Sequence, residues 1–273
     1  MTLYQGGMLF VGSALILFFA GFPLVWMFLT SIKPSADILV YPPRILGDYT
    51  LTHYRRLLED TRFLLYLKNS VVVAGATVLI DIVIASLGAY GLARYRFHGK
   101  ELLSTLTLFT YMFAPIMIII PIYVLLRNVG LADTHLGIIL AYTSISLPFS
   151  LWLLRAFFES FPVALEEAAF VDGANGFQTF MYVVIPQALP GIIATSVFAF
   201  VVVWNDYLFA RVLLSTPTLK TLPVGLQDIY QQGEIDWGLL MAGAVLVTVP
   251  ATGFFLMIQR YLVQGWGMGA VKG

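Results

Sequence analysis

The chain has 273 residues, of which 59% are hydrophobic and 11% are charged, whereas soluble domains carry about 25% charged residues. This composition predicts a membrane protein. Fifteen basic residues balance fifteen acidic ones, so no overall charge favours nucleic acid as a partner, and the absence of cysteine excludes disulfides and thiol chemistry.

Six apolar stretches predict an all-α, polytopic fold made of one transmembrane domain over residues 1–273. About 20 apolar residues are enough for a helix to cross the hydrocarbon core of a bilayer. No Lys or Arg precedes the first stretch, which is longer than the apolar part of a signal peptide, so we expect a retained span. The six predicted spans are residues 8–30, 70–92, 102–126, 136–154, 190–214 and 238–258.

The segments between the spans differ in character. Residues 31–67 are polar and aromatic, which predicts an ordered segment outside the membrane. Pro115 and Pro121 predict that the third span is bent or partly unwound. Residues 259–273 are expected to form a tail after the last span.

Two carboxylates lie inside predicted spans, where an ionisable group costs about 2.5–3.5 kcal/mol and therefore indicates a function or a partner. Asp81, in the middle of the second span, would either bind a neighbouring helix or couple an ion to transport. Asp206, in the fifth span, would either help to hold a sugar or pair with Arg211. The sugar interpretation rests on an aromatic plane beside polar acceptors, in the run Trp204, Asn205, Asp206 and Tyr207.

A stretch of polar and small residues, residues 155–189, separates the fourth and fifth spans. Residues 162–172 predict a short helix with Pro162 in its first turn, two glutamates near its start and Gly173 at its end. A second helix is expected to begin at the cap Asn175 and to end at Pro186. The pair predicts a rigid projection that inserts into a groove of another protein.

An alternative for this stretch is an amphipathic hairpin lying on lipid headgroups. Arg155 is its only basic residue, whereas interfacial helices are usually rich in Lys and Arg, so docking on a protein is favoured. Which side of the membrane it occupies stays open from charge alone. Six basic residues lie on its side and nine on the other, although three of the six are concentrated in residues 94–100.

The spacing of Glu167-Ala168-Ala169, Gly173 and Val183-x-Ile185-Pro186 resembles the EAA loop of permease subunits in binding-protein-dependent ABC importers. Val183 and Ile185 stand where Ile and Leu are more usual in that motif. Further stretches resemble the sugar-importing, maltose-type branch of the family. They are residues 66–70, 204–208, 221–226 and 269–273.

The resemblance implies a multi-pass subunit of the cytoplasmic membrane with both termini in the cytosol, which imports a sugar by alternating access. It implies a second, different permease, two ATPase subunits and an extracytoplasmic sugar-binding protein as partners. The residues matching the ATPase-docking motif are Glu166, Glu167, Ala168, Ala169, Phe170, Asp172 and Gly173. The loop before the last span would contact the binding protein through Gly225, Gln227, Tyr230 and Gly233, and residues 265–273 would reach the ATPase pair.

We expect no enzymatic activity, cofactor or metal in this chain. It lacks a GxxxxGK[ST] phosphate-binding loop, so ATP and Mg²⁺ are expected on the partner ATPases. Its histidines, His53, His98 and His135, lie far apart without metal-ligand spacing. A stand-alone secondary transporter, with Asp81 as its coupling residue, is the alternative function, but such a transporter would need an inverted repeat, and none is clear.

Overall fold

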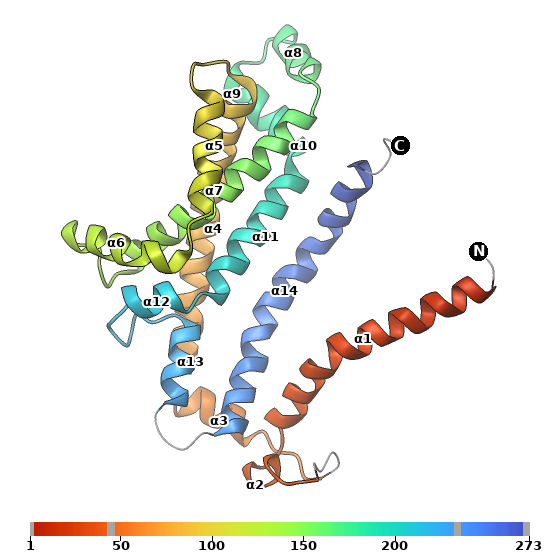
Figure 1. Cartoon of the computed structure of the whole chain (residues 1–273), viewed down its shortest axis with the longest axis vertical. Coiled ribbons are helices and arrows are strands. Elements are labelled where there is room, and N and C mark those ends of the chain that lie inside the picture. The colour runs from red at the N-terminus through yellow and green to blue at the C-terminus, as the bar shows by residue number, and fades with distance from the viewer. Residues whose placement is uncertain (1–2, 43–46, 232–235, 270–273) are drawn as a thin grey trace. The chain divides into compact units, whose positions relative to one another are not determined.

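The computed structural model describes residues 3–42, 47–231 and 236–269, and these residues form helices joined by turns (Figure 1). They group into two compact units. Unit 1 comprises Met1–Leu67 and Gly225–Pro250, and unit 2 comprises Lys68–Val224 and Ala251–Gly273. The predicted all-α class is confirmed.

Four helical segments within the described residues are each long and apolar enough to cross a membrane. The count rises to six if each of two bent helix pairs is one span. The six predicted spans therefore stay a prediction. The four segments are Gly12–Ser31 in α1 (Leu3–Ser31), α4 (Phe63–Arg94), α7 (His135–Ser160) and Trp237–Leu256 in α14 (Trp237–Gly269).

A bend is confirmed within residues 102–126, where the prolines predicted one. Helix α5 (Lys100–Tyr111) and helix α6 (Pro115–Asn128) meet at 102°. The residue before a proline is disfavoured in helical conformation, and Ala114 is extended, with φ −61° and ψ 129°. Pro115 then begins α6, where its missing N–H has no helical partner to lose.

The fifth and sixth predicted stretches differ from the observed helices. Instead of one helix over residues 190–214, α11 (Leu189–Asn205) ends before Asp206, and α12 (Leu208–Leu213) follows. The carboxylate of Asp206 accepts hydrogen bonds from backbone N–H groups of α12 and thereby starts a new helix. The expected tail is helical to Gly269, since α14 continues beyond residue 258.

Unit 1 contains α1, α2 (Ser35–Ile38), α3 (Thr52–Glu59), most of α13 (Leu222–Tyr230) and the first part of α14. The buried ring of His53 donates from Nε2 to the carbonyl of Lys33 at 2.9 Å. Asp236 accepts from the N–H of Leu239 at 3.0 Å, which caps α14, and pairs with Arg56 at 2.7 Å. These bonds order the polar segment around α3.

Unit 2 is built around α7, which contacts α5, α6, α11 and α12. Its core lies where α4, α7 and α11 meet the segment before α11. Alanines supply the α4 side of this core. Figure 1 shows α8 and α9 at one end of these helices, and α6 and α12 towards the other. The core residues are Ala85, Ala89, Leu154, Phe158, Phe180, Val184, Ala188 and Ile192.

At the end of unit 2 near α6 and α12, Asp133 joins two connections. Its N–H donates to the carbonyl of Leu213 at 3.1 Å. Its carboxylate accepts from the N–H of Ser215 at 2.8 Å, and from the N–H and hydroxyl of Thr216 at 3.0 and 2.6 Å. The connection between α6 and α7 is thereby tied to the one after α12.

Candidate functional site

The loop between α7 and α11 contains the short helix α8 (Ala164–Val171), close to the predicted bounds. Gly173 ends it in a left-handed conformation, with φ +87°. The N–H of Gly173 donates to the carbonyl of Phe170 at 3.1 Å, and the N–H of Ala174 donates to that of Ala169 at 2.9 Å. These two bonds make a Schellman motif, which fixes the direction in which the chain leaves α8.

A capping box begins the second half of the loop, as predicted. The side chain of Asn175 accepts from the N–H of Gln178 at 2.9 Å, and the side chain of Gln178 accepts from the N–H of Asn175 at 2.8 Å. Helix α9 (Gly176–Thr179) starts there and continues into a π-helical turn, Phe180–Val184.

The prediction that Pro186 ends this helix is wrong. Pro186 lies in the first turn of α10 (Ile185–Gln187), where a backbone N–H is not required. The change of direction comes after α10, between Gly176–Gln187 and α11, which meet at 74°. The loop therefore passes into α11 through helical turns, without an extended break at the proline.

The outer surface of the loop carries large exposed apolar side chains. Val171 is 87% exposed, Tyr182 78% and Phe177 70%, and Phe170 is half exposed. With the loop outside the bilayer, as predicted, such a cluster would indicate an interaction site. Of the predicted docking residues, Glu167, Ala168, Phe170, Asp172 and Gly173 are exposed, and Ala169 is partly so.

Glu166 differs from the other predicted docking residues because it faces inward. It is 5% exposed, and its carboxylate binds the side chains of Arg94 and Tyr90 at the end of α4. The interpretation that both glutamates of α8 face a partner is therefore wrong for Glu166. Only Glu167 presents its charge at the surface.

Asp81 is fully buried, and its carboxylate accepts hydrogen bonds from two serines of α7. The hydroxyl of Ser150 donates at 2.5 Å and that of Ser146 at 3.2 Å. These bonds join α4 to α7 at one position within the two helices. The geometry agrees with the structural interpretation of Asp81.

Asp206 likewise serves the packing of helices. Its Oδ2 accepts from the hydroxyl of the buried Tyr142 at 2.7 Å and from the N–H groups of Phe209 and Ala210 at 3.0 and 3.2 Å. Trp204 is 3% exposed and stacks on Phe200, with ring centroids 5.2 Å apart.

The predicted sugar-binding run is therefore divided between buried and exposed residues. The ring of Trp204 packs on Phe200, and the carboxylate of Asp206 is bound by Tyr142 and by backbone N–H groups of α12. Asn205 is exposed and Tyr207 is 39% exposed, but the amide of Asn205 already donates to the carbonyl of Val201 at 2.9 Å. The described residues do not bring these four side chains together into one sugar site.

Part of the predicted binding-protein loop is helical, because α13 extends to Tyr230. Gly225 is buried in α13 against Tyr66, and any side chain added there would come within 2.0 Å of that ring. Its role is close packing. Gln227 and Tyr230 are partly exposed on the same helix, and Gly233 lies outside the described residues.

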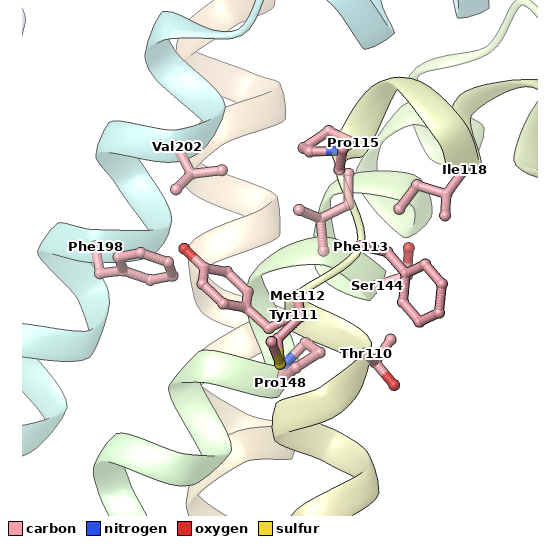
Figure 2. A pocket seen from close by; sticks show the side chains of 12 residues that line it. Thr110, Tyr111, Met112, Phe113, Pro115, Ile118, Ser144, Pro148, Phe198 and Val202 are labelled. Atoms are coloured by element: carbon pink, nitrogen blue, oxygen red, sulfur yellow. The ribbon is translucent and has the colours of Figure 1, made fainter.

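A cavity of about 380 Å³, which the sequence did not predict, lies at the bend between α5 and α6. Figure 2 shows the ring of Tyr111, at the end of α5, near Phe198 of α11, with Ser144 and Pro148 of α7 lining the same space. Aromatic faces with a few hydroxyl groups suit the alternating apolar and polar surfaces of a sugar ring. The signal in the sequence was Pro115, which predicted the bend but not its neighbours.

Within the described ranges, no group of three or more His, Asp or Glu side chains is arranged to hold a metal ion. His53 and His135 each bind a backbone carbonyl, of Lys33 and Leu219 respectively. Their ring nitrogens thus contribute to the folding of the connections between helices.

Comparisons of the sequence with known proteins identify the family. Residues 81–267 match the family described as binding-protein-dependent transport system inner membrane component. The trehalose/maltose transport system permease protein MalG of Thermococcus litoralis is 33% identical, over 97% of this chain and 96% of that protein. The trehalose transport system permease protein SugB of Mycobacterium tuberculosis is 35% identical, over 96% of each chain.

A solved structure has the same fold. It is a bacterial ABC transporter involved in the import of the acidic polysaccharide alginate, one chain of which superposes with a TM-score of 0.82 and 25% identity, over 96% of this chain and 98% of that one. The family indicated by the spacing around Glu167 and Gly173 is confirmed. The family match covers more than half of this chain, so the chain belongs to the inner membrane components of binding-protein-dependent transport systems.

Proposed function

We propose that this chain is a permease subunit of an ABC importer for a sugar, and that α8 docks on a separate ATPase subunit. The observation that carries the proposal is the exposed apolar surface around Phe170 and Val171, on a helix stopped by a Schellman motif between two long helices. The relatives named for trehalose and maltose transport support a sugar as the substrate.

In this proposal, ATP binding closes two ATPase subunits, and the docked α8 moves with them. The motion passes to α7 and α11, the helices at either end of the loop, and changes the side of the membrane to which the pathway opens. ATP and Mg²⁺ are bound by the ATPases. A second permease completes the pathway, an extracytoplasmic binding protein delivers the sugar, and α8 and both termini lie in the cytosol.

Co-purification and sugar binding test this function. The tagged chain, expressed together with its partner ATPase, permease and binding protein, is expected to retain the ATPase in detergent. The binding protein is then titrated with trehalose, maltose and alginate oligosaccharides, and uptake of the sugar that binds is measured in proteoliposomes. Uptake that continues without ATP, or a chain that retains no ATPase, would contradict the proposal.

The alternative of a secondary transporter is weakened by the two serine contacts that hold Asp81. We expect Asp81→Asn to keep uptake within about threefold of the unaltered chain, less than 1 kcal/mol, because an amide oxygen can still accept from Ser150. Uptake measured at several external pH values checks this. Loss of uptake with retained sugar exchange would favour ion coupling by Asp81.

We further propose that the cavity beside Tyr111 is where this chain contacts the sugar. Tyr111 is 43% exposed, and the centroid of its ring lies 6.2 Å from that of the Phe198 ring. Tyr111→Ala is expected to lower uptake about tenfold through loss of the stacking surface, on the order of 1.4 kcal/mol. Tyr111→Phe, which keeps the ring, is the matched control, and ATPase retention should be normal in both.

A further inference from the structure

Both oxygens of the buried Glu166 carboxylate accept hydrogen bonds from side chains of α4. Nε of Arg94 donates to Oε1 at 2.6 Å, and the hydroxyl of Tyr90 donates to Oε2 at 2.8 Å. The side chains of Arg94 and Glu166 are 13% and 7% exposed. Arg94 also donates from Nη2 to the carbonyl of Phe161, at the end of α7. Both charges are thus paired and further hydrogen-bonded, as a buried ion pair requires.

This contact joins segments that the chain does not connect locally, because Arg94 and Glu166 are 72 residues apart. Tyr90 contributes packing as well as a hydrogen bond. Its ring lies 4.9 Å from that of Phe180 in the π-helical turn and 5.9 Å from that of Phe158 in α7, measured between centroids. The end of α4 is therefore fixed to α8 and to both flanks of the loop.

A second contact ties the same helix to its neighbour. Asp81, further back along α4, accepts from Ser146 and Ser150 of α7. Helix α4 is thus held at its end by α8 and at Asp81 by α7. A displacement of α8 would act on the end of α4 through Glu166, and a displacement of α7, which moves with α8 in the proposed function, would act on α4 at Asp81.

We propose that Glu166, with Arg94 and Tyr90, is a transmission link that makes α4 move with α8 during the ATPase cycle. Glu166 acts as a positioning residue: it is covered by α4 and does not touch the ATPase. This inference rests on the proposed function, in which α8 docks on an ATPase. The proposed link adds α4 to the helices that move with the loop, which already include α7 and α11 because the loop connects them along the chain.

The first experiment separates docking from transmission. Glu166→Ala and Arg94→Ala are expected to retain the ATPase on purification, because the outer face of α8 is unchanged. Stimulation of ATPase activity by the sugar-loaded binding protein, and uptake per ATP hydrolysed, should fall about tenfold, within the usual range of coupling between sites. Glu166→Gln should be intermediate, since its amide offers one acceptor oxygen where two donors point.

The matched control is Glu101→Gln. Glu101 also forms an ion pair with an arginine, Arg155, at 3.0 Å, but its side chain is 77% exposed. Loss of that exposed pair should leave the stimulation unchanged. An equal loss in Glu101→Gln and Glu166→Gln would overturn the proposal, because the effect would then not depend on the buried link.

A covalent rescue tests the link itself. The chain has no cysteine, so Arg94→Cys with Glu166→Cys places two unique thiols at the ends of the lost ion pair. A short bifunctional thiol reagent is expected to restore stimulation that the double variant lacks. Normal stimulation of the ATPase in the double variant before cross-linking, or no stimulation after it, would contradict the proposed link. If the unaltered chain neither retains an ATPase nor imports a sugar, the proposed function fails instead.

Discussion

Replacing Gly173 with proline is expected to release the ATPase while the membrane helices stay folded. Gly173 has φ +87°, whereas proline fixes φ near −65°, and its N–H bond to Phe170 would be lost. Proline cannot adopt this φ, so the turn has to rearrange and change the position of α8 relative to α9. ATPase binding should then fall about 100-fold, on the order of 2.8 kcal/mol. Pull-down of the ATPase with the tagged chain measures this, and circular dichroism checks the helices.

Two further variants sharpen that result. Gly173→Asn should bind the ATPase nearly normally, because asparagine tolerates positive φ and a Cβ at this position meets nothing within 4 Å. Glu167→Lys reverses the one exposed glutamate of α8 and should also weaken binding. Normal ATPase binding and normal uptake in both Gly173→Pro and Glu167→Lys would show that α8 is not the docking element.

The second large effect is expected for Asp206→Ala. The change removes the cap of α12 and leaves the hydroxyl of Tyr142, a residue 1% exposed, without its acceptor. A lost cap and an unsatisfied buried donor together cost about 2–4 kcal/mol of folding free energy. Thermal unfolding in detergent, followed by tryptophan fluorescence, should show a lower midpoint.

Asp206→Asn is the control, because its side-chain oxygen can still accept the cap bonds and the tyrosine hydroxyl. It should recover most of the lost stability. If Asp206→Ala unfolds at the unaltered temperature but no longer imports sugar, Asp206 contacts the substrate after all. That outcome would restore the interpretation of residues 204–207 as a sugar site.

Local rules were enough to predict where α8 ends and where α9 begins, but not where the second helical segment ends. Gly173 and Asn175 act on atoms within five residues of themselves, through the Schellman motif and the capping box. The same holds for Pro115, which acts on the residue before it. Features set by neighbouring residues along the chain are readable without a structure.

Features set by distant segments were not predictable. Glu166 and Glu167 are adjacent acids of one short helix, and only the approach of Arg94 decides that the first is buried. The sequence predicted that Asp206 holds a sugar or pairs with Arg211. In the structure its Oδ2 accepts hydrogen bonds from Tyr142 and from the N–H of Phe209 in α12. The cavity beside Tyr111 needs Phe198 and Ser144, which come from two other helices.

The contacts of Asp133 bear on how this protein responds to acid. Partial burial alone would raise its pKa, but the hydrogen bonds from Ser215 and Thr216 outweigh burial and hold the pKa below its usual value. A carboxyl with a depressed pKa stabilises the fold at all pH values above its unfolded pKa, and this contribution is lost only as pH falls through the folded value. The hydrogen bonds of the Asp133 carboxylate to Ser215 and Thr216 should therefore stay formed from neutral to mildly acidic pH.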